Sequence, residues 1–181
     1  MRRHVKCIAL LLVVVVALVC VAAAQPSTPR PSDEPAAAAI GEGKLPAGYR
    51  DWRLVSVARE EGDLDDVRAV LGNDPAIKAY REGSTSSYPD GTIIARLAWS
   101  FDVSEENNRT FGRRQSFVAG HPKNGVQFMV KDATKYASTG GWGYSQFDGG
   151  KPLTDKAMLQ SCFECHKAVK DRDYVFTRYA Q

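Results

Sequence analysis

The chain has 181 residues and a formal net charge of +3, a length that fits one folded domain with appendages. Three of its 24 Lys and Arg residues, and none of its 21 Asp and Glu residues, lie in residues 1–24, so removal of that segment would leave 21 of each. A chain without a basic excess is not expected to bind nucleic acid or membrane surfaces.

Residues 1–24 have the pattern of a cleaved secretory signal peptide. Arg2, Arg3 and Lys6 precede a long apolar run, and three alanines then offer a small-residue cleavage site. An uncleaved anchor is the alternative, but the apolar run of 17 residues is at the low edge of the roughly 17–25 that a spanning helix needs. Lipidation at Cys20 is disfavoured by the bulky valine before it. We therefore expect export to the periplasm.

Residues 25–47 contain five prolines among Ser, Ala and Gly, a composition typical of a linker. The folded domain is expected at residues 48–181, beginning near Tyr49. This gives three parts: a signal peptide, a Pro/Ala-rich linker and one domain.

Within the domain, the patterns predict about five strands with short helices between them and at the end. Strands are expected at residues 53–59, 66–71, 92–101, 125–131 and 140–147, with a short one at 117–118. One helix should be capped by Asn73 or Asp74 and end at Gly83, and a turn should follow at residues 88–91. Residues 102–115 are expected to form a polar loop. A last helix, capped by Thr154 or Asp155, should run into His166. The fold class is α+β with a mostly antiparallel sheet.

The C-terminal helix carries Cys162-Phe163-Glu164-Cys165-His166, which has the spacing of a c-type haem attachment site. Residues three apart lie side by side on a helix, so two thiols reach the two vinyl groups of one haem. The adjoining histidine is the usual proximal iron ligand. After signal cleavage these are the only cysteines, and His121 is the only other histidine. A zinc site would need about four ligands, which these residues scarcely supply, and no thioredoxin-like pattern supports a redox pair.

The order and spacing of several short motifs resemble the cytochrome P-460 family, which includes the cytochromes c′-β. The resemblance covers most of residues 44–180. The motifs are Leu45-Pro46, Tyr49-Arg50-Asp51-Trp52, Asp74-Pro75, Asp90-Gly91-Thr92, Val130-Lys131-Asp132 with Lys135, Gly141-Trp142, the haem motif, and Val175-Phe176-Thr177. The resemblance implies a five-stranded antiparallel sheet, one covalently attached haem c, a proximal histidine, an open distal side and a homodimer.

Two positions favour the gas-binding branch over the hydroxylamine-oxidising branch. In the oxidising branch, the resemblance implies a lysine that cross-links to the haem and a glutamate that handles protons. Arg96 stands at the lysine position, and a guanidinium is a poor nucleophile. Gln127 aligns with the glutamate and cannot accept and return a proton. Both are candidate haem-pocket residues, Arg96 toward a propionate or a distal ligand and Gln127 as a distal donor; the alternative for each is an ordinary polar strand position.

The sequence offers few other residues for the iron and its distal side. His121 and Met129 are weak candidates for a sixth ligand, and Met158 shares the helix of the haem motif, so five-coordinate iron or a weakly bound water is expected. Lys78 and Lys123 do not stand at the cross-linking position. The aromatic candidates for the distal wall are Tyr88, Phe101, Phe117, Phe128 and Trp142.

These observations favour a periplasmic mono-haem protein that binds nitric oxide or another small diatomic, for scavenging, sensing or transport. His166 would be its metal ligand. Two alternatives remain: a haem oxidoreductase acting on hydroxylamine or nitric oxide, and a six-coordinate electron carrier. A redox partner protein is expected for either alternative.

Overall fold

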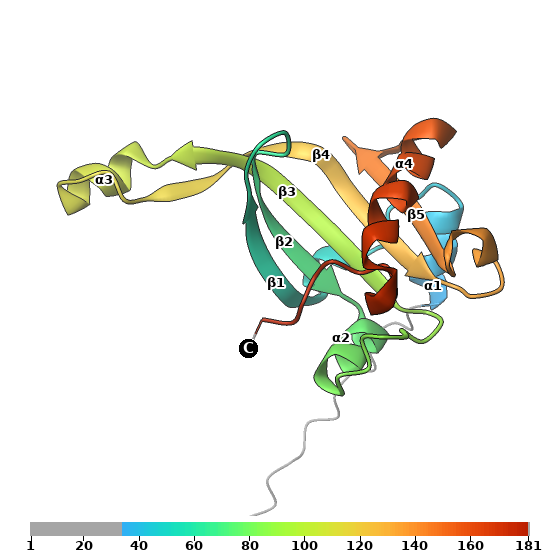
Figure 1. Cartoon of the computed structure of the whole chain (residues 1–181). Coiled ribbons are helices and arrows are strands. Elements are labelled where there is room, and N and C mark those ends of the chain that lie inside the picture. Colours follow the sequence, from blue (N-terminus) through green and yellow to red (C-terminus); the bar gives the residue numbers. More distant parts are fainter. Residues whose placement is uncertain (1–33, 181) are drawn as a thin grey trace, which may run out of the picture. The chain divides into compact units, whose positions relative to one another are not determined.

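The computed structural model describes residues 34–180, so the expected signal peptide and the first part of the expected linker lie outside the described residues. The folded unit is built on a six-stranded antiparallel sheet in which each strand pairs with its neighbour in sequence (Figure 1). The strands are β1 (Arg53–Glu60), β2 (Asp66–Gly72), β3 (Ile93–Val103), β4 (Phe117–Lys131), β5 (Trp142–Asp148) and β6 (Lys151–Pro152). The expected α+β class is confirmed, with six strands rather than about five because the two-residue β6 adds an edge strand.

Four α-helices and three short 3-10 helices accompany the sheet. The α-helices are α1 (Glu34–Gly41), α2 (Asp74–Arg81), α3 (Glu105–Phe111) and α4 (Lys156–His166). The 3-10 helices are η1 (Tyr49–Asp51), η2 (Ala137–Thr139) and η3 (Lys167–Arg172). Within residues 34–180, none of the helices combines the length and the apolar character that crossing a membrane requires.

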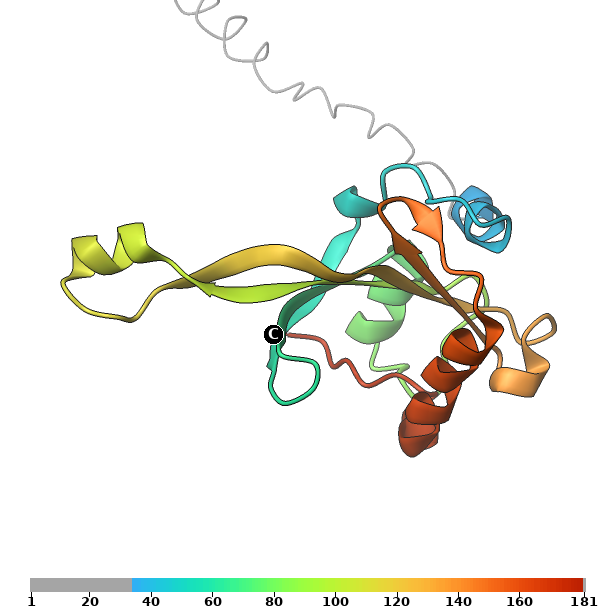
Figure 2. The same cartoon turned by 90° about the horizontal axis from the view of Figure 1, so that it is seen from above.

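The sheet separates two apolar cores, because side chains alternate between its faces. On one face, α1 contributes Ile40 to a core with Ile93, Phe128 and Phe147. On the other face, which we call the α4 face, α2 packs over Val70, Ile94 and Trp142, and α4 lies on the same side through the contact of Phe163 with Tyr144. Figure 2 shows α1 and α4 on opposite sides of the sheet.

The predicted start of α2 is confirmed in detail. The side chain of Asn73 caps the helix by accepting the backbone N–H of Ala76 at 3.2 Å, and it also accepts the N–H of Ile93 at 2.9 Å. The turn before β3 is also present, because the N–H of Thr92 donates to the carbonyl of Pro89 and Gly91 takes a positive φ of 83°. One buried asparagine thus joins α2 to the start of β3.

The prediction of a polar loop at residues 102–115 is wrong. This segment completes β3, forms α3 and leads into β4, which runs without a break from Phe117 to Lys131. Ser104 caps α3, and Gly112 ends it with a φ of 67°. The α3 sequence is nearly all polar, so it lacks the apolar periodicity on which helix prediction depends. The last part of β3, helix α3 and the first part of β4 form a projection that we call the arm. The arm extends beyond the rest of the sheet (Figures 1 and 2).

The expected boundary between linker and domain is too late. Helix α1 lies within residues 25–47, and its Ile40 is 4% exposed in the core of the sheet face opposite α4. Pro46 is also fully buried. The alanines that resemble a linker therefore form a helix, and the folded unit already includes residues well before Tyr49.

Candidate functional site

The Cys-Phe-Glu-Cys-His motif lies at the end of α4, as the sequence predicts. The side chain of Asp155 begins the helix by accepting the N–H of Ala157 at 2.8 Å and that of Met158 at 3.2 Å. Both cysteines are free thiols, Cys162 half-buried and Cys165 exposed. Three residues of separation on a helix keep the two sulfurs on neighbouring positions, so α4 presents both thiols beside His166.

His166 is held by a backbone carbonyl from beyond the end of η3. Its Nδ1 lies 2.6 Å from the carbonyl oxygen of Tyr174, and because a carbonyl only accepts, Nδ1 carries the proton. In the neutral ring, Nε2 then has a free lone pair for a metal. Burial lowers the pKa of His166, opposed by the hydrogen bond to Tyr174, so the ligand form is favoured.

An aromatic wall surrounds this histidine. The ring of His166 meets the edge of Tyr144 at 5.3 Å and that of Phe176 at 5.1 Å, both measured between ring centroids. Phe163 packs against Tyr144 at 6.4 Å and against Tyr174 at 5.7 Å. These contacts fix the plane of the imidazole from several sides.

Tyr144 has a buried hydroxyl that finds no hydrogen-bond partner among residues 34–180. Burial, followed by the nearby Cys162, raises its pKa. A buried hydroxyl without a partner is unfavourable by about 1–3 kcal/mol, so native structures seldom keep one without a reason. A polar group beside the two thiols and His166 would satisfy it, and the residues present therefore fit a haem bound at this place.

Arg96 and Gln127 lie side by side in one polar row across the sheet. Arg96 pairs with Gln127 in the strand register, and its Nη1 donates to Gln127 Oε1 at 2.7 Å. Gln127 in turn donates to Gln146 Oε1 at 2.8 Å. Arg96 Nη2 forms an ion pair with the fully buried Asp66, which also accepts Arg68 Nε at 2.8 Å.

This polar row shares the α4 face with the histidine site. Arg96 faces Val70 across the β2–β3 pairing, and Val70 belongs to the core on that face. The next row of the sheet along this face contains Ile94, Met129 and Tyr144. Burial lowers the pKa of Arg96, with a further contribution from Arg68, while Asp66 opposes the change.

The structure divides the proposed distal aromatics among three places. Tyr88 and Trp142 lie in the α4-face core with their rings 5.7 Å apart. Phe128 lies on the opposite face, so its assignment to the distal wall is wrong. Phe101 on β3 and Phe117 at the start of β4 stack on each other at 4.5 Å, and neither belongs to the core of the α4 face.

The other ligand candidates also have defined places. His121 is exposed on β4, where its N–H donates to Ser100 Oγ. Met158 is exposed on α4 itself. Among residues 34–180, no three or more His, Cys, Asp and Glu side chains converge to hold a metal ion.

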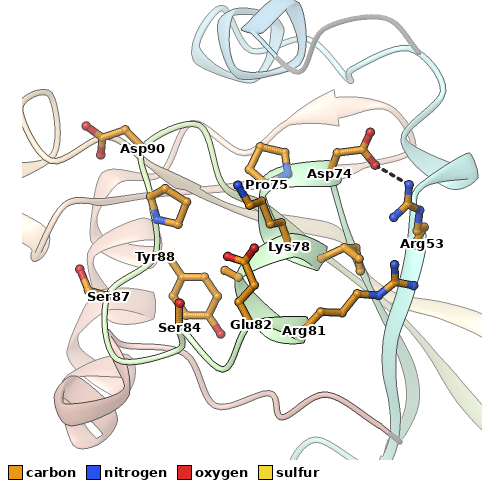
Figure 3. A pocket seen from close by; sticks show the side chains of 13 residues that line it. Arg53, Asp74, Pro75, Lys78, Arg81, Glu82, Ser84, Ser87, Tyr88 and Asp90 are labelled. Carbon is orange, nitrogen blue, oxygen red and sulfur yellow. Dashed lines mark ion pairs between the residues drawn. The ribbon is translucent and has the colours of Figure 1, made fainter. Parts of the chain in front are cut away.

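A groove of about 980 Å³ lies along α2 rather than at α4 (Figure 3). It is lined by charged and polar side chains, including Arg53, Lys78 and Arg81, and none of the haem-motif residues line it. Lys123 is elsewhere, with its amine donating to the carbonyls of Leu64 and Asp65. Neither Lys78 nor Lys123 is therefore placed beside His166.

Several residues of the site belong to no motif in the sequence. Tyr144 is two positions from Trp142 in a strand, so alternation alone would have placed both rings on one face. The Tyr174 carbonyl has no such signal because it is a backbone group, and the pairing of Asp66 with Arg96 joins residues 30 positions apart in the chain.

A helix that presents two thiols and a neutral imidazole against an antiparallel sheet is an arrangement that fits a haem-binding protein. The family model for cytochrome P460 matches residues 46–177, and the chain belongs to the cytochrome P460 family. Membership implies a haem cofactor. A comparison with the curated proteins found none that matches the chain.

Proposed function

We propose that the protein is an exported c-type haem protein that binds nitric oxide or another small neutral diatomic at an open, five-coordinate iron. Cys162 and Cys165 would form the two thioether bonds, and His166 would be the proximal ligand. Scavenging, sensing and transport all fit such a site. This proposal takes the gas-binding branch of the family rather than the hydroxylamine-oxidising branch.

The observation that carries the proposal is that Arg96 occupies the lysine position and is held there by an ion pair and a hydrogen bond. It stands where the oxidising branch is expected to have its cross-linking lysine, and its guanidinium is engaged by Asp66 and Gln127. A cross-link requires a neutral, nucleophilic nitrogen, whereas an arginine paired with a buried carboxylate remains protonated. Gln127 lacks the carboxylate that a proton relay would use.

Lys131, which also lies on the α4 face, does not replace the cross-linking lysine that is absent at position 96. Lys131 is 8% exposed, and both oxygens of Asp173 accept from its amine, at 2.7 and 2.8 Å. An ammonium held by a buried carboxylate is not a nucleophile. The chemistry of the two candidate positions thus favours ligand binding over oxidation.

The protein's own groups account for the rest of the mechanism. A bound haem supplies an iron that accepts a neutral diatomic ligand. The Tyr174 carbonyl keeps the proton on Nδ1 of His166, which leaves the lone pair of Nε2 available to bind an iron. Tyr144 and Phe176 pack edge-on against the His166 ring, and the buried Phe163 supports Tyr144 from behind. Met158 shares α4 with the thiols, so it lies on the side of the proximal ligand.

Absorption spectra of the purified holoprotein test the proposal. A broad ferrous Soret band that shifts when nitric oxide is added is the expected result. A strongly red-shifted ferrous band, the property that gave the family its name, would instead indicate a lysine cross-link and overturn the role given to Arg96. Sharp six-coordinate bands that carbon monoxide leaves unchanged would indicate an electron carrier. Intact mass should show one haem added through both cysteines.

We also propose export to the periplasm and a homodimer. Signal cleavage after Ala24 predicts a mature protein that starts at Gln25, which N-terminal sequencing of the exported form would check. The arm offers exposed apolar side chains, Phe111 and Val118 among them, and a two-stranded ribbon alone is marginally stable. A second copy of the chain would cover it. Light scattering should give a dimer mass, and Val118→Asp should shift it toward the monomer.

A further inference from the structure

The end of η3 contains two consecutive residues in the left-handed region of backbone space. Asp173 has a φ of 48° and Tyr174 a φ of 64°. Neither is glycine, and although aspartate can adopt this region, the position is disfavoured for tyrosine by roughly 1–2 kcal/mol. Such positions persist where the surrounding structure holds them, and they cluster at functional sites. Here the second of the two provides the carbonyl that binds His166.

A buried ion pair holds the first of these residues. Asp173 is 7% exposed, and its carboxylate accepts the Lys131 amine through both oxygens and the backbone N–H of Tyr88 at 2.8 Å. The Lys131 amine also donates to the carbonyl of Gly140 at 3.2 Å and lies 5.1 Å from the Trp142 ring centroid. Asp173 is therefore tied to β4 and to the segment before β3.

Backbone bonds transmit this anchoring to the neighbouring residue. The N–H of Asp173 donates to the carbonyl of Lys170, and that of Tyr174 to the carbonyl of Val169. The Tyr174 ring lies against Gly140, where a β-carbon would overlap it. The direction of the Tyr174 carbonyl thus depends on a turn that Lys131 holds from both sides, through Asp173 and through Gly140.

We propose that the buried Lys131–Asp173 ion pair positions the proximal histidine, by holding the turn at residues 173–174 so that the Tyr174 carbonyl receives the proton-bearing nitrogen of His166. This inference rests on the proposed function, since it treats His166 as the iron ligand. Partners in the second shell of a metal fix the tautomer and orientation of a ligating histidine and raise its basicity. Lys131 and Asp173 are positioning residues and touch neither the iron nor its ligand.

The test compares variants of the ferrous holoprotein by resonance Raman spectroscopy of the iron–histidine stretch. Asp173→Asn keeps an acceptor for the Tyr88 N–H and suits left-handed backbone, but it removes the charge that holds Lys131. It should lower the stretching frequency and broaden the band, as should Lys131→Met. Lys131→Arg should remain close to the parent. Lys44→Met is the matched control, because Lys44 forms an exposed pair with Glu42.

The double variant Lys131→Met with Asp173→Asn separates positioning from stability. It leaves no single buried charge, so its free energy of unfolding should stay closer to the parent than that of Lys131→Met alone. Its iron–histidine frequency should still be lowered. A stably folded double variant with the parental frequency and bandwidth would overturn the inference.

The comparison of iron–histidine frequencies among the variants does not depend on whether the protein binds nitric oxide. A parent protein that shows the iron–histidine band but ignores nitric oxide would contradict the proposed function and leave the comparison of variants intact. A parent protein without that band would contradict the proximal role of His166, and the inference with it.

Discussion

At the residue scale, Asp66 is the centre of the polar row beside the proposed haem site. Its carboxylate is fully buried between Arg68 and Arg96. Asp66→Asn would leave two arginines without their shared anion, and breaking a buried pair by removing one partner typically costs about 3–5 kcal/mol. Urea unfolding should show a loss of that size.

Asp65→Asn is the matched control for this prediction. The neighbouring Asp65 forms an ion pair with Arg59 at 2.7 Å, but its side chain is 64% exposed. Exposed pairs contribute about 0–1 kcal/mol, so the control should change the unfolding free energy little. Equal losses in the two variants would mean that burial of Asp66 is not what makes it important.

His166 is the residue on which the proposed function depends most directly. His166→Ala should keep haem attached through Cys162 and Cys165 but remove the proximal bond, changing the ferrous spectrum and the response to nitric oxide. Lys167→Ala alters the next residue, an exposed partner of Glu164, and should keep the parental spectrum. If the alanine variant at position 166 also keeps it, His166 is not the ligand.

At the element scale, the close packing of the η2–β5 connection against the turn after η3 predicts a specific weakness. Gly140 has a φ of 69°, and an added β-carbon would overlap the Tyr174 ring. Gly140→Ala should therefore destabilise the fold by more than backbone strain alone. Gly83→Ala isolates that strain, because Gly83 has a φ of 71° and nothing within 4 Å of the added carbon. Its cost should be about 1–2 kcal/mol.

The comparison is made by chemical unfolding of both variants under the same conditions. A loss in Gly140→Ala that exceeds the loss in Gly83→Ala measures the overlap with Tyr174. If the two losses are equal, Tyr174 moves aside without cost, and its ring does not contribute to holding the turn.

Elements marked by a pattern of neighbouring residues could be predicted from the sequence. Contacts between residues that lie far apart in the chain could not. Strand alternation gave β3, and the Asn73 cap gave α2, because each depends on neighbouring residues. Cys162 and His166 were likewise visible in one short motif. The pairing of Lys131 with Asp173 was not, because 42 positions separate them and only the folded sheet brings them together. Helix α1 was hidden by a linker-like composition.

At the scale of the whole molecule, burial of tyrosines gives the α4 face a dependence on alkaline pH. Tyr80, Tyr88 and Tyr144 all have pKa values raised, chiefly by burial. A phenol that ionises more readily in the unfolded chain favours unfolding as pH rises. The folded unit should therefore lose stability above the ordinary tyrosine pKa, although each of these groups stays neutral at lower pH.

Tyr80 allows this dependence to be measured. Burial raises its pKa from 10.0 to about 12, so its contribution is constant below pH 10 and is lost progressively between about pH 10 and 12. Because each pKa unit corresponds to about 1.4 kcal/mol, Tyr80 alone would account for a loss of up to about 3 kcal/mol. Tyr80→Phe removes the ionisation together with the hydrogen bond to the Thr177 carbonyl. It should lower stability by about 1 kcal/mol near pH 8 and flatten the alkaline decline. A decline as steep as that of the parent would mean that Tyr80 ionises equally well in the folded protein.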